Sequence, residues 1–303
     1  MDFKMNTYTS SSGARTLGAA LLCGLIMLGG CVEENATPIP DRAAYEPAEI
    51  EALSCVPNLD GKISSNELAE TLGVPVTQSV SPAGGSPTVD LAGKVDSSDN
   101  RQWDFSARDS ADQYIQVEAS DLSGKWYASS FPTGQFVVQG DSAGRTENIY
   151  SRDSDGFYLL GVASTEENPP EGKTLLVYEQ PIALYLFPLE KGKTWVSVGT
   201  TRNATLRGIP YAGKDTYTVT VEAVGELKLP DLTFEQTHMV RTEILLEPAV
   251  GMAVSQQQIS FIFECFGEVA RVISNTGETD DFFTTAQEVR KLALDERGTG
   301  ASL

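Results

Sequence analysis

Apolar and polar residues alternate with a period of two through most of the chain after residue 100. In Tyr217–Val224 the apolar residues Tyr217, Val219 and Val221 face one way and threonines the other. In Ile259–Cys265 all the odd-numbered residues share an apolar face, so the pattern places Cys265 among apolar neighbours. Because successive side chains of a strand point to opposite faces, both runs predict half-buried β-strands.

Turn residues separate many shorter runs of the same kind. Gly140-Asp141 and Asp155-Gly156 stand between alternating segments, which is typical of β-hairpins. The shorter predicted strands are Trp103–Phe105, Tyr114–Gln116, Trp126–Ala128, Phe136–Val138, Ile149–Tyr150, Phe157–Val162, Leu175–Tyr178, Ala183–Phe187 and Trp195–Val198. Phe282–Leu294 is compatible with a last strand or a short helix. We therefore expect a mainly β fold, an antiparallel meander that forms a curved sheet, half-barrel or barrel.

The first 30 residues have the parts of an export signal. Lys4 and Arg15 are basic, and the apolar run Leu17–Gly30 follows them. This run is shorter than the roughly 20 apolar residues that a membrane-spanning helix needs. Residues 1–30 are therefore expected to be a signal peptide.

The run Leu28-Gly29-Gly30-Cys31 resembles the bacterial lipobox. That resemblance implies cleavage before Cys31 and a diacylglycerol on the Cys31 sulfur, and two or more acyl chains anchor firmly. Val32 stands where an inner-membrane retention signal often has Asp, which favours the outer membrane, facing the periplasm or the cell surface. The alternative is an ordinary signal peptide whose cleavage site precedes a cysteine.

Composition divides the rest of the chain. Residues 31–54 are acidic and contain proline, as in a flexible tether. Residues 55–100 are expected to form a turn-helix element and a loop-rich stretch with a weak strand signal at Val89–Val95, and residues 101–303 a β-domain. The net charge of −20 argues against nucleic acid and against adhesion to anionic lipid head groups. The acyl group on Cys31 would then be the only link to the membrane.

Each of the four cysteines has its own expected fate. Cys23 leaves with the signal peptide and Cys31 takes the lipid, so Cys55 and Cys265 remain. In an oxidising compartment a disulfide between them is the natural assignment, and two buried free thiols are the alternative.

The segment Cys55–Leu68 resembles a degenerate EF-hand or dockerin calcium loop. The resemblance assigns ligand positions to Asn58, Asp60, Lys62, Ser64 and Glu67. Val56 replaces the first carboxylate, so any calcium affinity would be weak, on the order of millimolar. The alternative is structural: Asp60-Gly61 makes a tight turn, and Ser64 with Glu67 caps a helix over Ser65–Leu72.

A second resemblance covers about residues 101–295. Phe187-Pro188-Leu189 followed by Gly192 and Trp195 resembles a strand entry in exported bacterial β-domains. This pattern is similar to that of lipoproteins from myxobacteria and their relatives, and more loosely to half-barrel periplasmic domains. The resemblance implies a fold and no established activity.

Catalytic motifs are sparse. His238 is the only histidine, and no GxSxG motif flanks a serine, so we expect no triad and interpret His238 as a surface or lining residue. Asp153 and Asp155 are conceivable as a glycosidase pair, although acids at a hairpin tip are usually only solvated. We expect no catalytic residue and no cofactor beyond weak calcium. The expected function is non-enzymatic: binding of a hydrophobic ligand or an envelope protein partner, or a structural role. An envelope hydrolase using acidic residues and a calcium-dependent interaction module are the alternatives.

Overall fold

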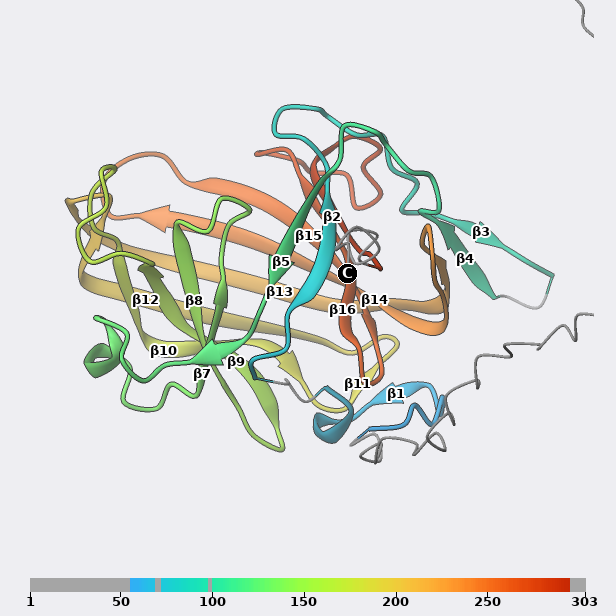
Figure 1. The fold of residues 1–303 in the computed structure, drawn as a ribbon, viewed down its shortest axis with the longest axis horizontal. Coiled ribbons are helices and arrows are strands. Elements are labelled where there is room, and N and C mark those ends of the chain that lie inside the picture. Colours follow the sequence, from blue (N-terminus) through green and yellow to red (C-terminus); the bar gives the residue numbers. More distant parts are fainter. Residues whose placement is uncertain (1–54, 69–71, 98–99, 295–303) are drawn as a thin grey trace, which may run out of the picture. The chain divides into compact units, whose positions relative to one another are not determined.

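The computed structural model describes residues 55–68, 72–97 and 100–294, which are mainly strands and turns. Fifteen strands of these residues form one large sheet (Figure 1). In spatial order its main path is β5 (Gln113–Val117), β2 (Val76–Val80), β17 (Ala286–Leu292), β16 (Gly267–Ser274), β15 (Val254–Phe263), β14 (Thr233–Pro248), β13 (Ile209–Lys228), β12 (Thr194–Leu206), β10 (Leu175–Leu186), β9 (Gly156–Ser164), β8 (Thr146–Arg152), β7 (Phe136–Gln139) and β6 (Ser120–Asp121). The predicted antiparallel meander is confirmed.

Two short strands lie beside this path. β4 (Arg101–Asp104) pairs with β13 in parallel, and β3 (Lys94–Val95) pairs with β4. A separate two-stranded sheet joins β1 (Lys62–Ile63) to β11 (Leu189–Glu190). The short 3-10 helices are η1 (Ser65–Leu68) and η2 (Ala128–Ser130).

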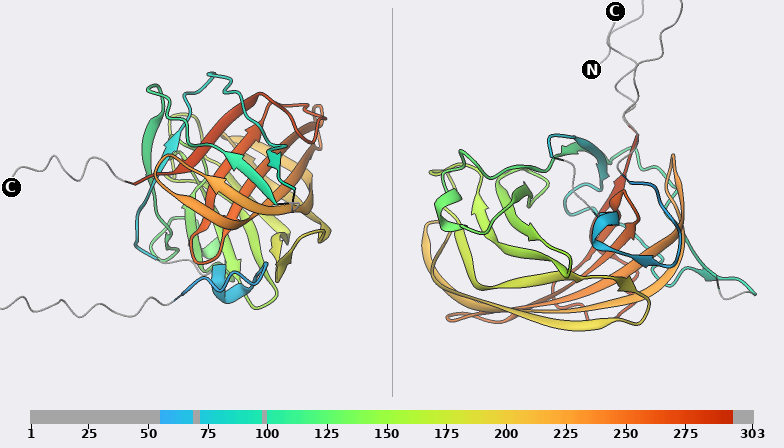
Figure 2. Two further views of the ribbon diagram at one scale, coloured as in Figure 1. Left: turned by 90° about the vertical axis from the view of Figure 1, so that its right-hand side faces the viewer. Right: turned by 90° about the horizontal axis from the view of Figure 1, so that it is seen from below.

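The sheet is strongly curved and open. Its edge strands β5 and β6 are not hydrogen-bonded to each other in the part of the chain that the structure describes. Only Glu118 and Ala119 separate them in sequence, a link that spans at most about 11 Å from Val117 to Ser120. The sheet therefore has to curl until its edges approach, and Figure 2 shows the resulting half-shell. Of the expected forms, the structure has the curved open sheet rather than a closed barrel.

The face of β14–β17 that points away from the hollow carries the largest core. Val89, Leu91, Trp103 and Phe105, together with Phe283 of the loop before β17, cover it. Phe261 of β15 makes edge-to-face contacts with Trp103, at 5.1 Å between ring centroids, and with Phe105, at 5.3 Å. The indole of Trp103 donates to the carbonyl oxygen of Leu91 at 2.9 Å, so burial leaves its N–H satisfied.

The inner face of β13 follows the predicted alternation. Val219 and Val221 are fully buried in one cluster with Ile63 and Leu189, and Tyr217 packs against it. The small β1–β11 sheet thus covers one end of the concave face.

Three predicted strands differ in detail from the structure. The segment Trp126–Ala128 forms turns that lead into η2, although its pattern resembles a short strand. The predicted strands Leu175–Tyr178 and Ala183–Phe187 are parts of one strand, β10, which runs through Pro181 with a register shift between Val177 and Ile182. Proline is tolerated there because the ladder is already interrupted.

The expected boundary at residue 100 does not separate two structural units. β2 lies inside the main sheet between β5 and β17, within a stretch expected to be loop. Of the weak signal at Val89–Val95 only β3 is a strand, and the ambiguous C-terminal segment contains the strand β17. The helix predicted to extend to Leu72 ends earlier, because Leu72 forms an isolated bridge with Ala119.

Candidate ligand-binding cavity

The concave face of the sheet encloses a cavity of about 490 Å³, which we call the concave cavity. Its volume lies within the roughly 300–1,000 Å³ typical of small-molecule sites. The apolar lining residues are Leu68, Val74, Val76, Val117, Ala119, Phe136, Val138, Tyr150, Phe157, Leu159, Leu184, Tyr185, Tyr217, Ile244, Ile262, Phe266 and Leu292. The polar ones are Gln78, Gln139, Asn148, Thr242, Gln258, Glu268, Arg271 and Arg290, and Cys265 and Gly267 complete the set.

One wall of the cavity is aromatic. Phe136, Tyr150, Phe157 and Tyr185 come from the four strands β7 to β10, which are neighbours in the sheet. The ring of Phe157 lies 5.0 Å from Tyr150, 5.8 Å from Phe136 and 5.8 Å from Tyr185, between centroids. Such a group presents a broad apolar surface, which favours contact with hydrocarbon or another apolar molecule.

Burial keeps the tyrosines that line the cavity neutral. It raises the pKa of Tyr150, Tyr185 and Tyr217 above the ordinary value for a phenol. The Tyr150 hydroxyl also accepts a hydrogen bond from Nδ2 of Asn148 at 3.0 Å. At physiological pH these side chains therefore offer apolar rings with neutral hydroxyl groups.

The opposite wall is charged, and its residues come from β15, β16 and β17. Arg271 and Arg290 are directly opposite each other in the β16–β17 ladder. Nε of Arg271 lies 2.7 Å from Oε1 of Glu268, whose Oε2 accepts a hydrogen bond from Ser260 at 2.7 Å. Nε of Arg290 lies 2.5 Å from Glu288. The cavity is therefore amphipathic, with an aromatic side and a charged side.

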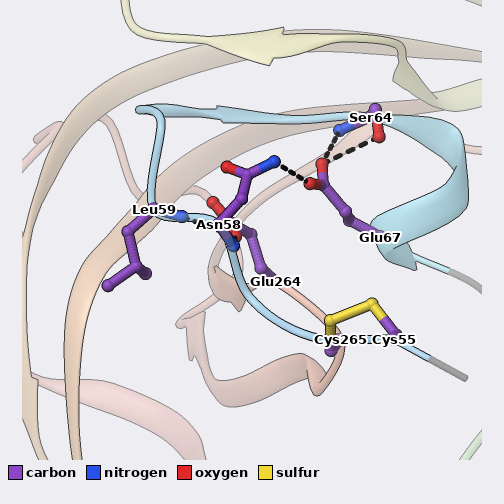
Figure 3. The surroundings of a disulfide bond; sticks show 7 residues. All are labelled: Cys55, Asn58, Leu59, Ser64, Glu67, Glu264 and Cys265. Carbon is purple, nitrogen blue, oxygen red and sulfur yellow. Dashed lines mark hydrogen bonds between the residues drawn. A yellow bond between two sulfur atoms is a disulfide. The ribbon is translucent and has the colours of Figure 1, made fainter. Parts of the chain in front are cut away.

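The N-terminal element, Cys55–Leu68, closes one end of the cavity, and Leu68 contributes to its lining. The predicted disulfide between Cys55 and Cys265 is confirmed (Figure 3), with 5.5 Å between the Cα atoms. Cys265 follows the end of β15 and has a positive φ of 67°, so it leaves the face of Phe263 that the alternation predicted and lines the cavity instead.

Glu264 provides a second link to the same element. It is 1 % exposed, and its Oε2 accepts hydrogen bonds from the backbone N–H groups of Asn58 at 2.6 Å and Leu59 at 3.0 Å (Figure 3). The backbone N–H of Cys265 also donates to the carbonyl oxygen of Glu67 at 2.7 Å. Charged acceptors make the stronger hydrogen bonds, so Glu264 holds the turn firmly against the sheet.

His238 is buried, so the expectation of a surface or lining residue is wrong. Its Nε2 lies 3.1 Å from the carbonyl oxygen of Gly61 and its Nδ1 lies 3.2 Å from that of Gln236. Burial lowers the pKa of His238, although both carbonyl groups favour the charged form. A neutral imidazole has one N–H and can donate to only one of the two oxygens. His238 therefore acts as a structural contact beneath the N-terminal element.

The predicted calcium ligands lie together in this element, in a turn where they bond to one another. Oδ1 of Asn58 accepts from the N–H of Asp60 at 2.9 Å, and Oδ1 of Asp60 accepts from the N–H of Lys62 at 3.0 Å. Oε2 of Glu67 accepts from the N–H and the hydroxyl of Ser64, both at 2.8 Å, which is the predicted capping contact.

The remaining contacts of these residues involve ordinary partners. Oε1 of Glu67 accepts from Nδ2 of Asn58 at 2.5 Å, and Nζ of Lys62 pairs with Glu190 at 2.7 Å. Within residues 55–68, 72–97 and 100–294 no three His, Cys, Asp or Glu side chains are arranged to hold a metal ion. The weak calcium site stays a prediction.

The acidic pair Asp153 and Asp155 lies in the β8–β9 turn. Oδ1 of Asp153 accepts from the N–H groups of Asp155 at 2.8 Å and Gly156 at 2.9 Å. Through these hydrogen bonds Asp153 stabilises the turn, which accounts for acidic residues at this position.

Cys31, the signal peptide and the tether lie outside the described residues. In the part of the chain that the structure describes, no helix has the length and apolarity needed to cross a membrane. The charged wall of Glu268, Arg271 and Arg290 was not predicted from the sequence.

Comparison with protein-family models, curated proteins and solved structures finds no match to this chain.

Proposed function

We propose that this protein is a non-enzymatic lipoprotein of the bacterial envelope whose concave cavity binds a hydrophobic ligand. The observation that carries the proposal is the aromatic wall formed by Phe136, Tyr150, Phe157 and Tyr185 around a cavity of about 490 Å³. A cavity of this size with mostly apolar lining is the usual form of a small-molecule site.

Attachment to the membrane forms the second part of the proposal. The lipobox-like sequence that ends at Cys31 supports a diacylglycerol anchor, and Val32 favours the outer membrane. The tether of residues 32–54 would then carry the domain in the periplasm or at the cell surface. In cell fractionation we expect the wild type in the membrane fraction and Cys31→Ser in the soluble fraction or unprocessed. A processed, membrane-bound Cys31→Ser variant would contradict the lipid anchor.

Ligand binding is tested in two steps. Native mass spectrometry after gentle purification is expected to show a small apolar molecule bound to the domain, and organic extraction releases it for identification. A neutral fluorescent probe, N-phenylnaphthylamine, should then bind the emptied protein with increased emission. A protein without a co-purified molecule that also fails to bind the probe would overturn the proposal.

A pair of matched variants places the binding in the cavity. Val138 of β7 lines the cavity, whereas Val196 of β12 is 61 % exposed. Val138→Trp places an indole ring in the cavity and is expected to weaken probe binding at least about tenfold, which corresponds to a loss of about 1.4 kcal/mol. Val196→Trp adds the same side chain at the surface and should leave binding unchanged. Equal binding by both variants would show that the probe lies elsewhere.

A further inference from the structure

Two arginines face each other on the wall of an otherwise largely apolar cavity. Arg271 of β16 and Arg290 of β17 are cross-strand partners, and both line the concave cavity. Like charges directly opposite each other in a sheet are destabilising. The side chain of Arg290 is also only 7 % exposed, so little bulk water is available to screen it. Glu268 and Glu288 each offset one of the two charges, and a bound anion would further reduce the repulsion between the guanidinium groups.

The carboxylates near the two arginines engage one edge of each guanidinium group. Among the described residues Arg271 forms its ion pair through Nε, which lies 2.7 Å from Oε1 of Glu268. The two groups are not aligned for a hydrogen bond. Arg290 forms its ion pair through Nε with Glu288, at 2.5 Å. The hydrogen bonds of the described residues include none from the terminal Nη groups of Arg271 or Arg290 to another side chain, so these donors can bind a ligand. Planar guanidinium groups bind carboxylate and phosphate oxygens in pairs.

Other polar atoms of the same wall fit a ligand head group. Gln78 lines the cavity on β2, the strand next to β17, and its Nε2 is a donor that an anionic head group could use, whereas its buried Oε1 can only accept. Gln258 donates to Ser260 at 3.0 Å, and Ser260 donates to Glu268. The carboxylate of Glu268 is thereby held on the Ser260 side of Arg271. The aromatic wall meets this group at Tyr185, whose hydroxyl hydrogen-bonds with Ser260.

Building on the proposed function, we infer that the ligand of the concave cavity is an acidic amphiphile whose carboxylate or phosphate binds Arg271 and Arg290. Its hydrocarbon part lies against Phe136, Phe157 and Tyr185. A free fatty acid and a phosphorylated lipid fragment share this chemistry.

The test compares three probes of equal chain length on the delipidated protein: a long-chain fatty acid, the alkyl phosphate and the fatty alcohol. We expect at least one acid to bind about tenfold to a hundredfold more tightly than the alcohol, the effect of one or two hydrogen bonds to a charged group. Preference for the carboxylate or for the phosphate then identifies the source. Equal binding of acids and alcohol would overturn the head-group inference but leave the proposed function intact. Failure of all three probes to bind would remove both.

A double variant assigns the preference to the arginines. Arg271→Met with Glu268→Gln removes the guanidinium group without leaving an unpaired carboxylate, and it should reduce the preference for acids over the alcohol by about tenfold, because Arg290 alone remains to bind the head group. The control is Arg241→Met with Glu222→Gln, because this ion pair lies on the opposite face of the same sheet, at 2.8 Å. A preference for acids that is unchanged in the cavity variant would contradict the inference. Should that variant fail to fold, the comparison of probes on the wild type decides.

Discussion

Removing the Cys55–Cys265 disulfide tests how the N-terminal element is held. The bond joins residues 210 positions apart and so encloses nearly the whole described domain. In the chain-entropy relation, closing a loop of this length lowers the entropy of the unfolded chain enough to stabilise the fold by about 5 kcal/mol at 25 °C. Small domains are stable by only about 5–15 kcal/mol in total, so the variant Cys55→Ala with Cys265→Ala should be markedly less stable.

The native state of that variant should retain its cavity. Glu264 still binds the N–H groups of Asn58 and Leu59, and the β1–β11 pairing still holds Ile63 against Leu189. The loss of stability therefore arises mainly in the unfolded state, which gains conformational freedom. We accordingly expect ligand binding to change little in the absence of denaturant.

Urea unfolding followed by tryptophan fluorescence measures the effect. The wild type with reductant and the double variant should unfold at similar, lower urea concentrations, and reductant should not affect the variant. A loss of less than about 1 kcal/mol would refute the reasoning, because the loop-closure contribution would then be absent. A separate early transition in the variant would also count against it, since the N-terminal element would then be undocking on its own.

Three further predictions concern the same region. Glu264→Ala should lower the free energy of unfolding by about 3 kcal/mol in urea titrations, because two hydrogen bonds from Asn58 and Leu59 to a buried charge are lost; a loss under 1 kcal/mol would contradict their role. His238 has a lowered pKa in the fold, so the unfolded chain binds the proton more tightly and stability should fall as pH drops below about 6.5. His238→Gln should remove that part of the pH dependence, and identical profiles for variant and wild type would refute it. Glu67→Gln should cost about 1 kcal/mol with or without millimolar calcium, as expected for a cap; a cost that appears only with calcium would instead indicate that the loop binds the ion.

The sequence predicts the main sheet well where a strand has one apolar and one polar face. Tyr217, Val219 and Val221 share a face as expected, and Asp155-Gly156 forms the predicted hairpin turn. These signals are local, because alternation and turn chemistry depend on residues that are neighbours in the chain. The disulfide could also be predicted from the sequence, because assigning Cys23 to the signal peptide and Cys31 to the lipid leaves only Cys55 and Cys265.

Features that depend on distant pairing were missed. The sequence of β2, Val76–Val80, contains Thr, Gln and Ser and resembles a loop, yet it lies between β5 and β17 in the sheet. Its pairing with β17 brings together residues more than 200 positions apart, such as Val80 and Arg290. No local pattern shows that such a partner exists.

The charged wall escaped prediction because the usual assignment of faces is inverted in β15–β17. On β15 the wholly apolar face, with Ile259 and Phe261, packs outward under Trp103. The other face is more polar because it carries Gln258 beside Ile262, and this face lines the cavity. A polar residue on an alternating strand is normally taken to face bulk solvent.

Here the sheet curls around its more polar face, so residues that would otherwise meet open water are enclosed. The ladder then aligns Val221, Val240, Ser260, Arg271 and Arg290 in one row across five strands. This row changes from aliphatic to charged as it crosses the concave face. A wholly apolar ligand would offer no acceptor to the terminal Nη groups of Arg271 and Arg290, whereas a small polar ion would leave the aromatic wall exposed to water. An acidic amphiphile would satisfy both the arginines and the aromatic wall, so under the proposed function the curvature of the sheet, more than any single residue, would determine which ligand the cavity accepts.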